Sequence, residues 1–394
     1  MELSQKLNQL SYNVFADMDL VKTEAKALGK TVIDLSLGSS DLPTPKIVLN
    51  AIKESLNDTS THGYLLHDGT LEFRKEASFW YTKKYGIVIN PNTEVLPLIG
   101  CQEGTAHLPL AILNPGDFAL LTDPGYPSHA GGVHLASGQI YNMPLLAENK
   151  FLPVYEDIPK DIVKQAKLMI LSYPHNPTSA IASVEFFRKT INFCQTNKII
   201  LIHDFPYADI YFTGTSQPPS IFQADVNKEI AIEFFTFSKS YNMGGFRIGF
   251  AIGNAQLIKA LKQVKSAIDF NQYKGILNGA IAALKSPPEL VKNTVSIFEQ
   301  RRDAFIKSLQ DIGWNVSTPC ATLYLWAKLP EKWNSTDIDF CVQLLKEKGV
   351  ATSPGSGFGK SGKGYVRFAL VKDTEILEIA AQKIAQFFKD KDII

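Results

Sequence analysis

The stretch IAIEFFTFSKSYNMGGFRIGFAIG, residues 230–253, decides the fold class. It contains two short runs, Ile232–Phe237 and Ile248–Ile252, in which nearly every position is apolar rather than every second one. Such runs are typical of strands in a parallel sheet that helices cover on both faces. Four earlier runs have the same character: Glu94–Ile99, Phe118–Thr122, Leu168–Ser172 and Ile199–His203.

Longer helical patterns separate these runs. They include Thr70–Tyr85, Glu103–Leu113 and Val184–Thr196. The alternation of strands and helices predicts an α/β fold. We expect a large domain over residues 46–284, with a mostly parallel central sheet covered by helices.

The two ends of the chain have a different pattern. Residues 14–30 look like one amphipathic helix closed by a glycine, and a long helix follows residue 288. Two strand-like runs and a C-terminal helix come next, the runs being Ala321–Ala327 and Gly364–Val371. We expect a smaller α+β domain, discontinuous in sequence, made of residues 1–45 and 285–394.

Composition excludes several classes of partner. The chain has 394 residues, with 40 Lys+Arg against 39 Asp+Glu, and no long basic cluster, so we expect no nucleic-acid partner. Its four cysteines are far apart with no C-x-x-C spacing, which argues against a disulfide scaffold or a structural metal site. The N-terminus lacks the pattern of a signal peptide and no run approaches about 18 apolar residues, so we expect a cytoplasmic protein without membrane contact.

The residues directly after the strand-like runs are the candidates for a site. In open α/β sheets, ligands bind beyond the carboxyl ends of the strands, where loops and helix N-termini converge. The five segments at these positions are Gly100–Gly104, Asp123–Pro127, Tyr173–Thr178, Asp204–Tyr207 and Ser238–Lys239. Each alone has an ordinary explanation, such as a turn, a helix cap or a solvated charge. Their joint order along the chain is the stronger signal.

Seven motifs follow one another along the chain: SLGSSDLPTP (36–45), HGYLLHDGTLEFR (62–74), DPGYPSHAGG (123–132), SYPHNPTSA (172–180), HDFPY (203–207), FSKSYNMGGFRIGF (237–250) and GYVRFAL (364–370). Their order resembles that of class I/II aminotransferases, the pyridoxal-phosphate enzymes of fold type I, and the resemblance covers nearly the whole chain. Within the family, the stretches VFADMDLVKTEAKALGK (14–30), HAGGVHLASGQIYNMPLLAENKFLP (129–153) and KSAID (265–269) most resemble LL-diaminopimelate aminotransferases and their alanine- and aspartate-directed relatives.

The resemblance implies a catalytic role for three residues. Lys239 would bind the cofactor aldehyde through its amine and later carry the proton of the substrate. Asp204 would keep the pyridine nitrogen protonated through a charge-assisted hydrogen bond. Tyr207 and Asn176 would both reach the phenolic oxygen of the cofactor.

The remaining implied contacts hold the cofactor and the substrate. Tyr126 would stack on the cofactor ring, and Tyr64 would reach the phosphate from a neighbouring subunit, which implies a homodimer. Arg367 and Gly38, with Asn176, would bind the substrate carboxylate. The phosphate itself would be bound by Cys101, Gln102, Thr236, Ser238 and Arg247.

Some features depart from the pattern or mislead. Position 179 is Ser where the family usually has Gly, and Ser40 replaces the usual proline. The segment GFGKSG (357–362) fits G-x-G-x-x-G, but a strand-like run follows it where a dinucleotide site needs a helix. We interpret it as the loop before Arg367.

The leading hypothesis is an aminotransferase that moves an amino group between an L-amino acid and a 2-oxo acid, with a role in amino-acid and lysine biosynthesis. Alternatives on the same fold are an alanine or aspartate aminotransferase and a β-eliminating C–S lyase. A non-catalytic regulator would need a DNA-binding module, for which the chain has neither spare length nor a basic patch. The sequence does not identify a residue that binds the far end of the substrate side chain.

Overall fold

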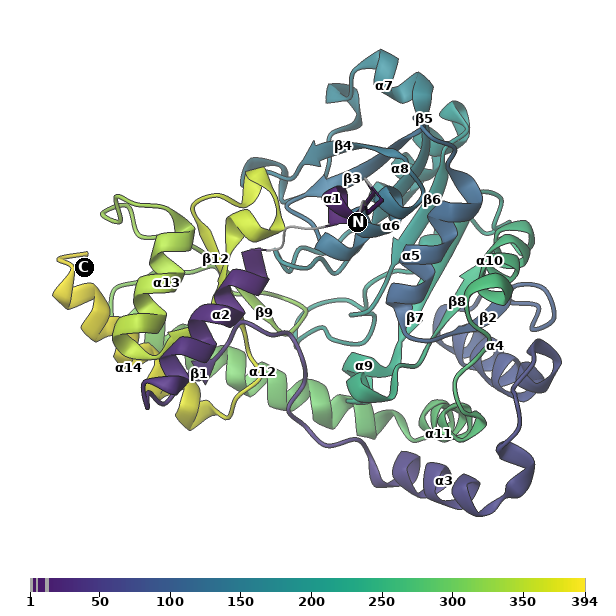
Figure 1. The fold of residues 1–394 in the computed structure, drawn as a ribbon, viewed down its shortest axis with the longest axis horizontal. Helices are drawn as coiled ribbons and strands as arrows, with labels where there is room; N and C mark the ends of the chain where they lie inside the picture. The colour runs from purple at the N-terminus through teal and green to yellow at the C-terminus, as the bar shows by residue number, and fades with distance from the viewer. Residues whose placement is uncertain (1–2, 5, 11–13, 394) are drawn as a thin grey trace.

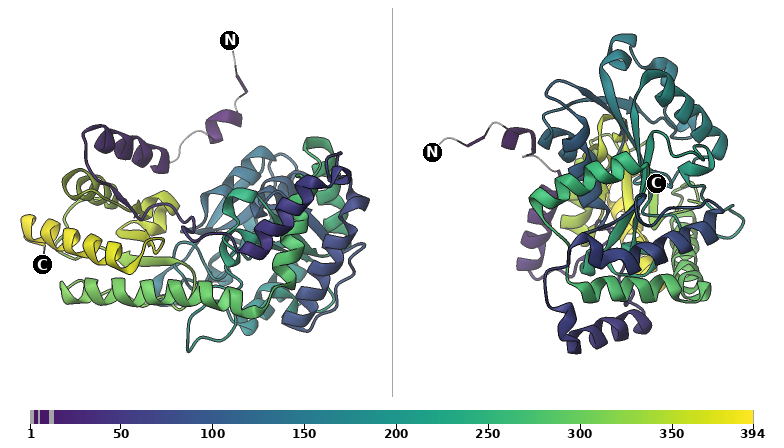
Figure 2. Two further views of the ribbon diagram at one scale, coloured as in Figure 1. Left: turned by 90° about the horizontal axis from the view of Figure 1, so that it is seen from below. Right: turned by 90° about the vertical axis from the view of Figure 1, so that its right-hand side faces the viewer.

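The computed structural model describes residues 3–4, 6–10 and 14–393. Part of the segment 1–45, expected to belong to the small domain, lies outside the described residues. Figure 1 shows a large sheet with helices on both faces, and beside it a second group of strands and helices that holds the C-terminus. The long helix α12 (Pro288–Asp311) runs along both groups (Figure 2).

The large sheet has seven strands in the order β2-β8-β7-β6-β5-β3-β4. Six of them run in one direction, and only β8 is antiparallel to its neighbours β7 and β2. The strands are β2 (Val95–Leu98), β3 (Phe118–Asp123), β4 (Gln139–Pro144), β5 (Ala166–Leu171), β6 (Ile200–Asp204), β7 (Ala231–Thr236) and β8 (Gly249–Gly253). All six runs expected to be strands lie in this sheet, and the α/β fold class is confirmed.

The edge strand β4 was not expected. Its residues are mostly exposed or half-buried, and its sequence, QIYNMP, has no continuous apolar run. Both β2 and β4 are edge strands, but β2 is buried throughout whereas β4 is mostly in contact with solvent. The apolar signal that identified the other six strands is therefore absent from β4.

Two separate cores explain why the central strands are apolar at every position. On β5, Leu168 and Ile170 belong to one cluster, whereas Met169 and Leu171 belong to the other. Side chains alternate between the faces of a strand, so a sheet covered on both sides needs apolar residues throughout. One face is covered by α5 (Cys101–Ile112), α6 (Pro127–Leu135) and α10 (Ala255–Ile268), the other by α4 (Leu71–Tyr85), α8 (Val184–Asn197) and α11 (Lys274–Lys285).

One buried acid interrupts the apolar pattern of β7. Glu233 is fully buried, and its carboxylate accepts hydrogen bonds from the Ile221 N–H at 2.9 Å and the Ser220 hydroxyl at 2.7 Å. His203 Nδ1 of β6 lies 2.7 Å from the same carboxylate. A buried carboxylate is tolerated when it is hydrogen-bonded in this way. The network therefore satisfies a charge inside the sheet and ties β6 to β7.

The second group of elements is built around a small antiparallel sheet in the order β11-β12-β9. Helices α2 (Val14–Ala27), α13 (Asp337–Lys348) and α14 (Thr374–Asp390) surround it. Its strands are β9 (Tyr324–Lys328), β11 (Ser353–Pro354) and β12 (Tyr365–Ala369). The N-terminal part of the chain joins this group because β1 (Ile33–Asp34) pairs with β10 (Val350–Ala351). The domain boundaries expected from the sequence stay a prediction.

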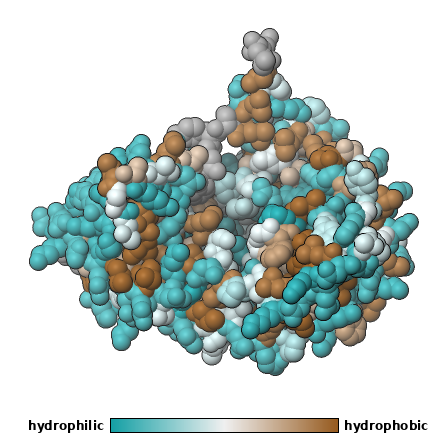
Figure 3. Space-filling view, turned by 60° about the horizontal axis from the view of Figure 1, so that its bottom comes forward, coloured by the Kyte–Doolittle hydropathy of each residue, from teal (hydrophilic) through white to brown (hydrophobic). Residues whose placement is uncertain are grey.

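Surface and hydropathy add two observations. Hydrophilic and hydrophobic residues are intermixed over the face shown in Figure 3. Across the described part of the chain, no helix combines the length and the apolar character needed to cross a membrane.

Candidate active site

A cavity of about 420 Å³ lies between the carboxyl edge of the large sheet and the small sheet. It contains twelve of the thirteen residues expected at the site. These are Gly38, Cys101, Gln102, Tyr126, Asn176, Asp204, Tyr207, Thr236, Ser238, Lys239, Arg247 and Arg367. Tyr64 is the exception: it does not line this cavity and its side chain is 92% exposed.

Strand direction explains how distant residues meet at this edge. Helix α5 begins at Cys101, directly after β2, and the short helix α9 (Phe237–Ser240) begins directly after β7. Because β8 runs in the opposite direction, its first residues lie at the same edge as the ends of its neighbours. Arg247 therefore enters the cavity from the start of β8.

A glycine makes room for that arginine. Gly100 has a φ of +77°, and a Cβ built there would lie 2.5 Å from Nη2 of Arg247. Arg247 itself has a φ of 52°. Beside it, the hydroxyl of Thr236 accepts a hydrogen bond from the Ser238 N–H at 3.1 Å. A guanidinium, two hydroxyls and the N-terminus of a twelve-residue helix together suit an anion such as a phosphate.

Asp204 ends β6 and is buried at the bottom of the cavity. One carboxylate oxygen, Oδ2, lies 3.0 Å from His129 Nε2. The other, Oδ1, is buried and has no hydrogen-bond partner among the described residues. A buried carboxylate oxygen without a partner is costly unless a bound ligand supplies a donor. The unsatisfied atom therefore indicates a position for a protonated ring nitrogen.

Lys239 follows β7 and lines the cavity. Its Nζ donates a hydrogen bond to the carbonyl oxygen of Gly38 and lies 5.8 Å from the ring centroid of Tyr207. The Tyr207 hydroxyl donates to the hydroxyl of Tyr324 at 2.9 Å. Each of these groups comes from a different segment of the chain, so the amine is surrounded by residues that only the fold brings together.

Arg367 faces Lys239 from the small sheet. It is 6% exposed, and its Nη1 donates to Asn176 Oδ1 at 2.8 Å while Nη2 donates to the Ser36 carbonyl at 2.6 Å. The guanidinium lies between two rings, 4.2 Å from the centroid of Tyr324 and 4.6 Å from that of Phe358. Its buried Nε has no partner among the described residues. A buried arginine with spare donors suits a carboxylate ligand.

Tyr324 was not expected at the site. Burial raises the pKa of a phenol, but at Tyr324 the charges of Lys239 and Arg367 and the hydrogen bond from Tyr207 outweigh burial, so its pKa lies below the ordinary value. The pKa of Tyr207 is raised well above that value, first by burial and then by Tyr324. The two phenols therefore keep distinct roles, with Tyr207 as donor and Tyr324 as acceptor.

Sequence reasoning missed other residues around the cavity as well. Tyr324 lies in the expected strand Ala321–Ala327, but nothing in that run distinguishes it from a core tyrosine. His129 follows the Pro-Gly-Tyr-Pro turn and had no separate signal. The cavity also contains Met18, Asp19 and Lys22 of α2, a helix that the sequence predicted but did not place near the site.

Two departures from the family pattern are accommodated. Ser179 has a φ of 62°, a conformation that glycine adopts at less cost. Its hydroxyl donates to the Tyr324 carbonyl at 2.9 Å. Ser40 donates to Asn242 Oδ1 at 2.7 Å. The GFGKSG segment forms two short 3₁₀ turns before β12, as expected for a loop.

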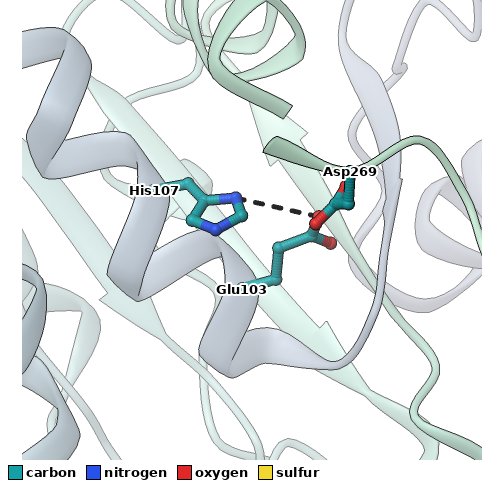
Figure 4. A group of neighbouring side chains, drawn as sticks. All are labelled: Glu103, His107 and Asp269. Atoms are coloured by element: carbon teal, nitrogen blue, oxygen red, sulfur yellow. Dashed lines mark ion pairs between the residues drawn. The ribbon is translucent and has the colours of Figure 1, made fainter. Parts of the chain in front are cut away.

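Figure 4 shows Glu103, His107 and Asp269, which are grouped closely enough to hold a metal ion. However, the ammonium of Lys265 already donates to Glu103 at 2.5 Å and to Asp269 at 2.8 Å. Burial raises the pKa of Glu103 to about 7, against the opposing charge of Lys265. These contacts compensate the acids and tie α5 to α10, so we interpret the group as structural.

The fold and the lysine that lines the cavity define the class of protein: an α/β enzyme that binds its cofactor at the carboxyl edge of a sheet. The family model "Aminotransferase class I and II" matches residues 30–384, and the chain belongs to this family. It is a pyridoxal-phosphate-dependent aminotransferase, and the resemblance inferred from the motifs is confirmed.

Several relatives are similar over almost their full length. The LL-diaminopimelate aminotransferase of Dehalococcoides mccartyi strain 195 is 40% identical over 387 residues, which is 98% of this chain and 99% of that protein. The protein of that name from Aquifex aeolicus is 41% identical and covers 97% of this chain and 98% of its own.

Two solved structures are similar in fold and sequence. Substrate-bound BacF from Bacillus subtilis superposes with a TM-score of 0.94 at 33% identity, covering 98% of both chains. A probable N-succinyldiaminopimelate aminotransferase from Thermus thermophilus gives a TM-score of 0.90 at 40% identity, covering 95% of this chain and 99% of its own.

Proposed function

We propose that this aminotransferase exchanges an amino group between LL-diaminopimelate and a 2-oxo acid, in the cytoplasm and in the service of lysine biosynthesis. The observation that carries the proposal is the 40% identity, over nearly the whole of both chains, to proteins named LL-diaminopimelate aminotransferase. The cavity supports the proposal, because its side chains offer hydrogen-bond donors for both a phosphate and a carboxylate.

The residues of the cavity fit pyridoxal phosphate. The unpartnered Oδ1 of Asp204 suits the protonated pyridine nitrogen, and the anion site around Arg247 suits the phosphate. In this proposal Lys239 binds the aldehyde, and Tyr126 covers the ring. Cys101, Gln102, Thr236 and Ser238 complete the phosphate site, and Asn176 and Tyr207 contact the phenolic oxygen. When bound, the cofactor supplies an electron sink for the carbanion of the substrate.

The residues of the chain perform the remaining steps. Arg367 binds the α-carboxylate of the substrate, Asn176 keeps the guanidinium in place, and the close backbone of Gly38 limits the space. With the carboxylate held there, the Cα–H bond would lie within reach of Lys239. The free amine of Lys239 would then take the proton from Cα and deliver it to the cofactor carbon that carried the aldehyde, so that the donor leaves as a 2-oxo acid and the amino group stays on the cofactor. Tyr207 has one O–H, which it donates to Tyr324 in this structure. On cofactor binding it would turn to the phenolic oxygen, and its raised pKa keeps it a donor.

We further propose that the active unit is a homodimer. Tyr64 is almost fully exposed, and its ring lies 6.2 Å from that of Phe270, which is also exposed. Two adjacent aromatic rings in solvent suit a contact with a second copy of the chain. In the dimer Tyr64 would reach the phosphate of the neighbouring cavity.

A panel of amino donors tests the substrate. The purified enzyme, loaded with pyridoxal phosphate, is assayed with LL-diaminopimelate, alanine and aspartate against 2-oxoglutarate and pyruvate. We expect LL-diaminopimelate to give the highest kcat/KM. A higher value for alanine or aspartate would reject the proposed substrate.

Omitting the 2-oxo acid distinguishes a transaminase from a lyase. With a donor alone, a transaminase stops after one turnover because its cofactor keeps the amino group. Continuous release of pyruvate and ammonia from a cystathionine-like substrate would instead indicate β-elimination.

A further inference from the structure

We propose that Asp19 and Lys22 of α2 bind the far end of the amino donor, with Asp19 facing its ammonium group and Lys22 its carboxylate. This inference rests on the proposed function, because LL-diaminopimelate carries both of these groups on its far carbon.

The charges around the cavity identify the pair. The described residues that line it include six charged side chains. In the proposed function four of these have a role: Lys239 binds the aldehyde, Asp204 the ring nitrogen, Arg247 the phosphate and Arg367 the α-carboxylate. One acid and one base remain. An acid and a base side by side suit a ligand group that carries both an ammonium and a carboxylate. They suit a side chain that is purely apolar, purely acidic or purely basic poorly. The six are Asp19, Lys22, Asp204, Lys239, Arg247 and Arg367.

The two residues are adjacent on one face of α2. They are three positions apart, and Lys22 Nζ lies 2.5 Å from Asp19 Oδ1. Helix α2 packs against α13 and β11 and lies beside the small sheet (Figure 1). Asp19 and Lys22 both line the cavity. Asp19 is 68% exposed, so its carboxylate is free to turn toward a ligand, whereas Lys22 is only 13% exposed.

Lys22 and Arg367 are held by the same segment of the chain, around Ser36. Lys22 Nζ donates to Asp34 Oδ2 at 3.0 Å and to the Ser36 hydroxyl at 3.2 Å. The carbonyl of Ser36 in turn accepts from Arg367 Nη2 at 2.6 Å. A single residue, Ser36, therefore contacts both the arginine assigned to the near carboxylate and the lysine proposed for the far one. Such an arrangement suits one short substrate with a charged group at each end.

Binding would exchange partners within this group and leave the charge balanced. The far carboxylate would take the place of Asp19 at Lys22, and the Asp19 carboxylate would pair with the far ammonium. Asp34 would keep Lys22 in position throughout. Burial lowers the pKa of Lys22, but Asp19 and Asp34 outweigh it and the pKa is raised, so the amine stays charged. A donor that lacks one of the two far groups would leave one member of the pair without a partner.

The test compares three donors with the cofactor-loaded enzyme. LL-diaminopimelate has both far groups, lysine lacks the far carboxylate, and 2-aminopimelate lacks the far ammonium. The change in cofactor absorbance with donor alone gives an apparent dissociation constant for each. We expect the wild-type enzyme to bind LL-diaminopimelate about 10- to 100-fold more tightly than either analogue, the range of a charged hydrogen bond.

Two substitutions should remove this preference separately. Lys22→Gln should abolish the preference over lysine, and Asp19→Asn the preference over 2-aminopimelate. Lys22→Arg keeps a cation at this position and should restore the preference over lysine. A merely structural role for Lys22 would instead make Lys22→Gln weaken the binding of all three donors to the same extent. Lys26→Gln and Glu24→Gln make the same charge changes at exposed positions of α2 outside the cavity, and should leave both preferences intact.

The outcomes separate this inference from the proposed function. If the wild-type enzyme does not distinguish the three donors, or both variants keep its preferences, the inference is wrong even though aminotransfer from another donor is observed. If the preferences are present and lost as described, but the amino group never reaches a 2-oxo acid, the inference stands and the proposed function is wrong.

Discussion

The two walls of the cavity are built in different ways. The wall assigned to the cofactor comes from one sheet: the segments after β2, β3, β5, β6 and β7 and the start of β8 contribute its residues, from Cys101 to Arg247. The wall assigned to the substrate comes from separate pieces, namely α2, the segment around Ser36, and strands β9, β11 and β12. One wall is fixed by a single sheet, whereas the other depends on how several segments pack.

This difference has a consequence for mutation. Residues at the edge of one sheet share a rigid frame, so changes there should affect cofactor binding and chemistry. Residues on the assembled wall should affect recognition of the donor while the cofactor stays bound. Substitutions on the two walls should therefore have separable effects.

The largest effect is expected for Lys239→Ala, on the cofactor wall. Without this amine, the aldehyde loses the group that binds it covalently and the Cα proton loses its base. Lys22, the other lysine among the described residues of the cavity, is held by Asp19, Asp34 and Ser36. We expect kcat to fall more than about 1000-fold. Borohydride reduction followed by peptide mapping should attach the cofactor to the Lys239 peptide in the wild type and to no peptide in the variant. Retained turnover in the variant would contradict the proposed role.

A smaller effect is expected for Gly38→Ala on the substrate wall. A Cβ there would lie 1.8 Å from the Tyr324 hydroxyl, so the backbone or the phenol must move. We expect kcat/KM to fall about 10- to 100-fold while the cofactor remains bound. Gly245→Ala is the control, because its Cβ would meet nothing within 4 Å. Equal activity of the two variants would show that the close approach at Gly38 is unimportant.

A substitution of His175 tests the segment between the two walls, because His175 precedes Asn176, whose side chain accepts from Arg367. Burial lowers the pKa of His175 to about 3, so the folded protein favours the neutral ring. Between pH 6.5 and about 3 the unfolded chain therefore binds more protons, and stability falls as the pH falls. In the wild type the free energy of unfolding falls between pH 7 and pH 5, and His175→Gln should make this fall smaller by about 2 kcal/mol. Denaturant unfolding at both pH values measures this, and an unchanged pH dependence would contradict it.

The smallest effect is expected for Tyr324→Phe. The variant keeps the ring against which Arg367 packs but removes the hydroxyl that accepts from Tyr207. In the loaded enzyme the Tyr207 hydroxyl then keeps its contact with the phenolic oxygen and loses the one with Tyr324. We expect kcat to fall about 3- to 10-fold, the cost of one neutral hydrogen bond, with donor KM nearly unchanged. A large rise in KM instead would place Tyr324 in direct contact with the donor.

The same contrast explains what the sequence could predict. Strand runs such as Leu168–Ser172 are apolar throughout because two cores need them, and the rule that ligands bind at strand carboxyl ends then pointed to Asp204 and Lys239. Arg247 precedes a strand instead of following one. It reaches the cavity because β8 runs antiparallel to β7. Its assignment, like that of Arg367, came from the resemblance to a family.

The assembled wall had no comparable local signal. Asp19 and Lys22 look like ordinary exposed charges of an amphipathic helix, and only the packing of α2 against α13 and β11 brings them to the cavity. Tyr324 is one aromatic residue in a buried strand. The edge strand β4 was missed for a related reason, because polar residues replace the apolar run there. These features depend on contacts between segments that are far apart in the sequence, so no local sequence pattern predicts them.

The central claim is that the two walls act separately, and a pair of matched substitutions tests it most directly. Arg247→Gln and Arg367→Gln each remove one guanidinium from the same cavity. For both variants we would measure the dissociation constant of pyridoxal phosphate and the KM of LL-diaminopimelate. We predict that Arg247→Gln weakens cofactor binding at least about 10-fold, whereas Arg367→Gln changes it less than about 3-fold and raises the donor KM at least about 10-fold. Loss of the cofactor from Arg367→Gln to the same extent as from Arg247→Gln would contradict the account.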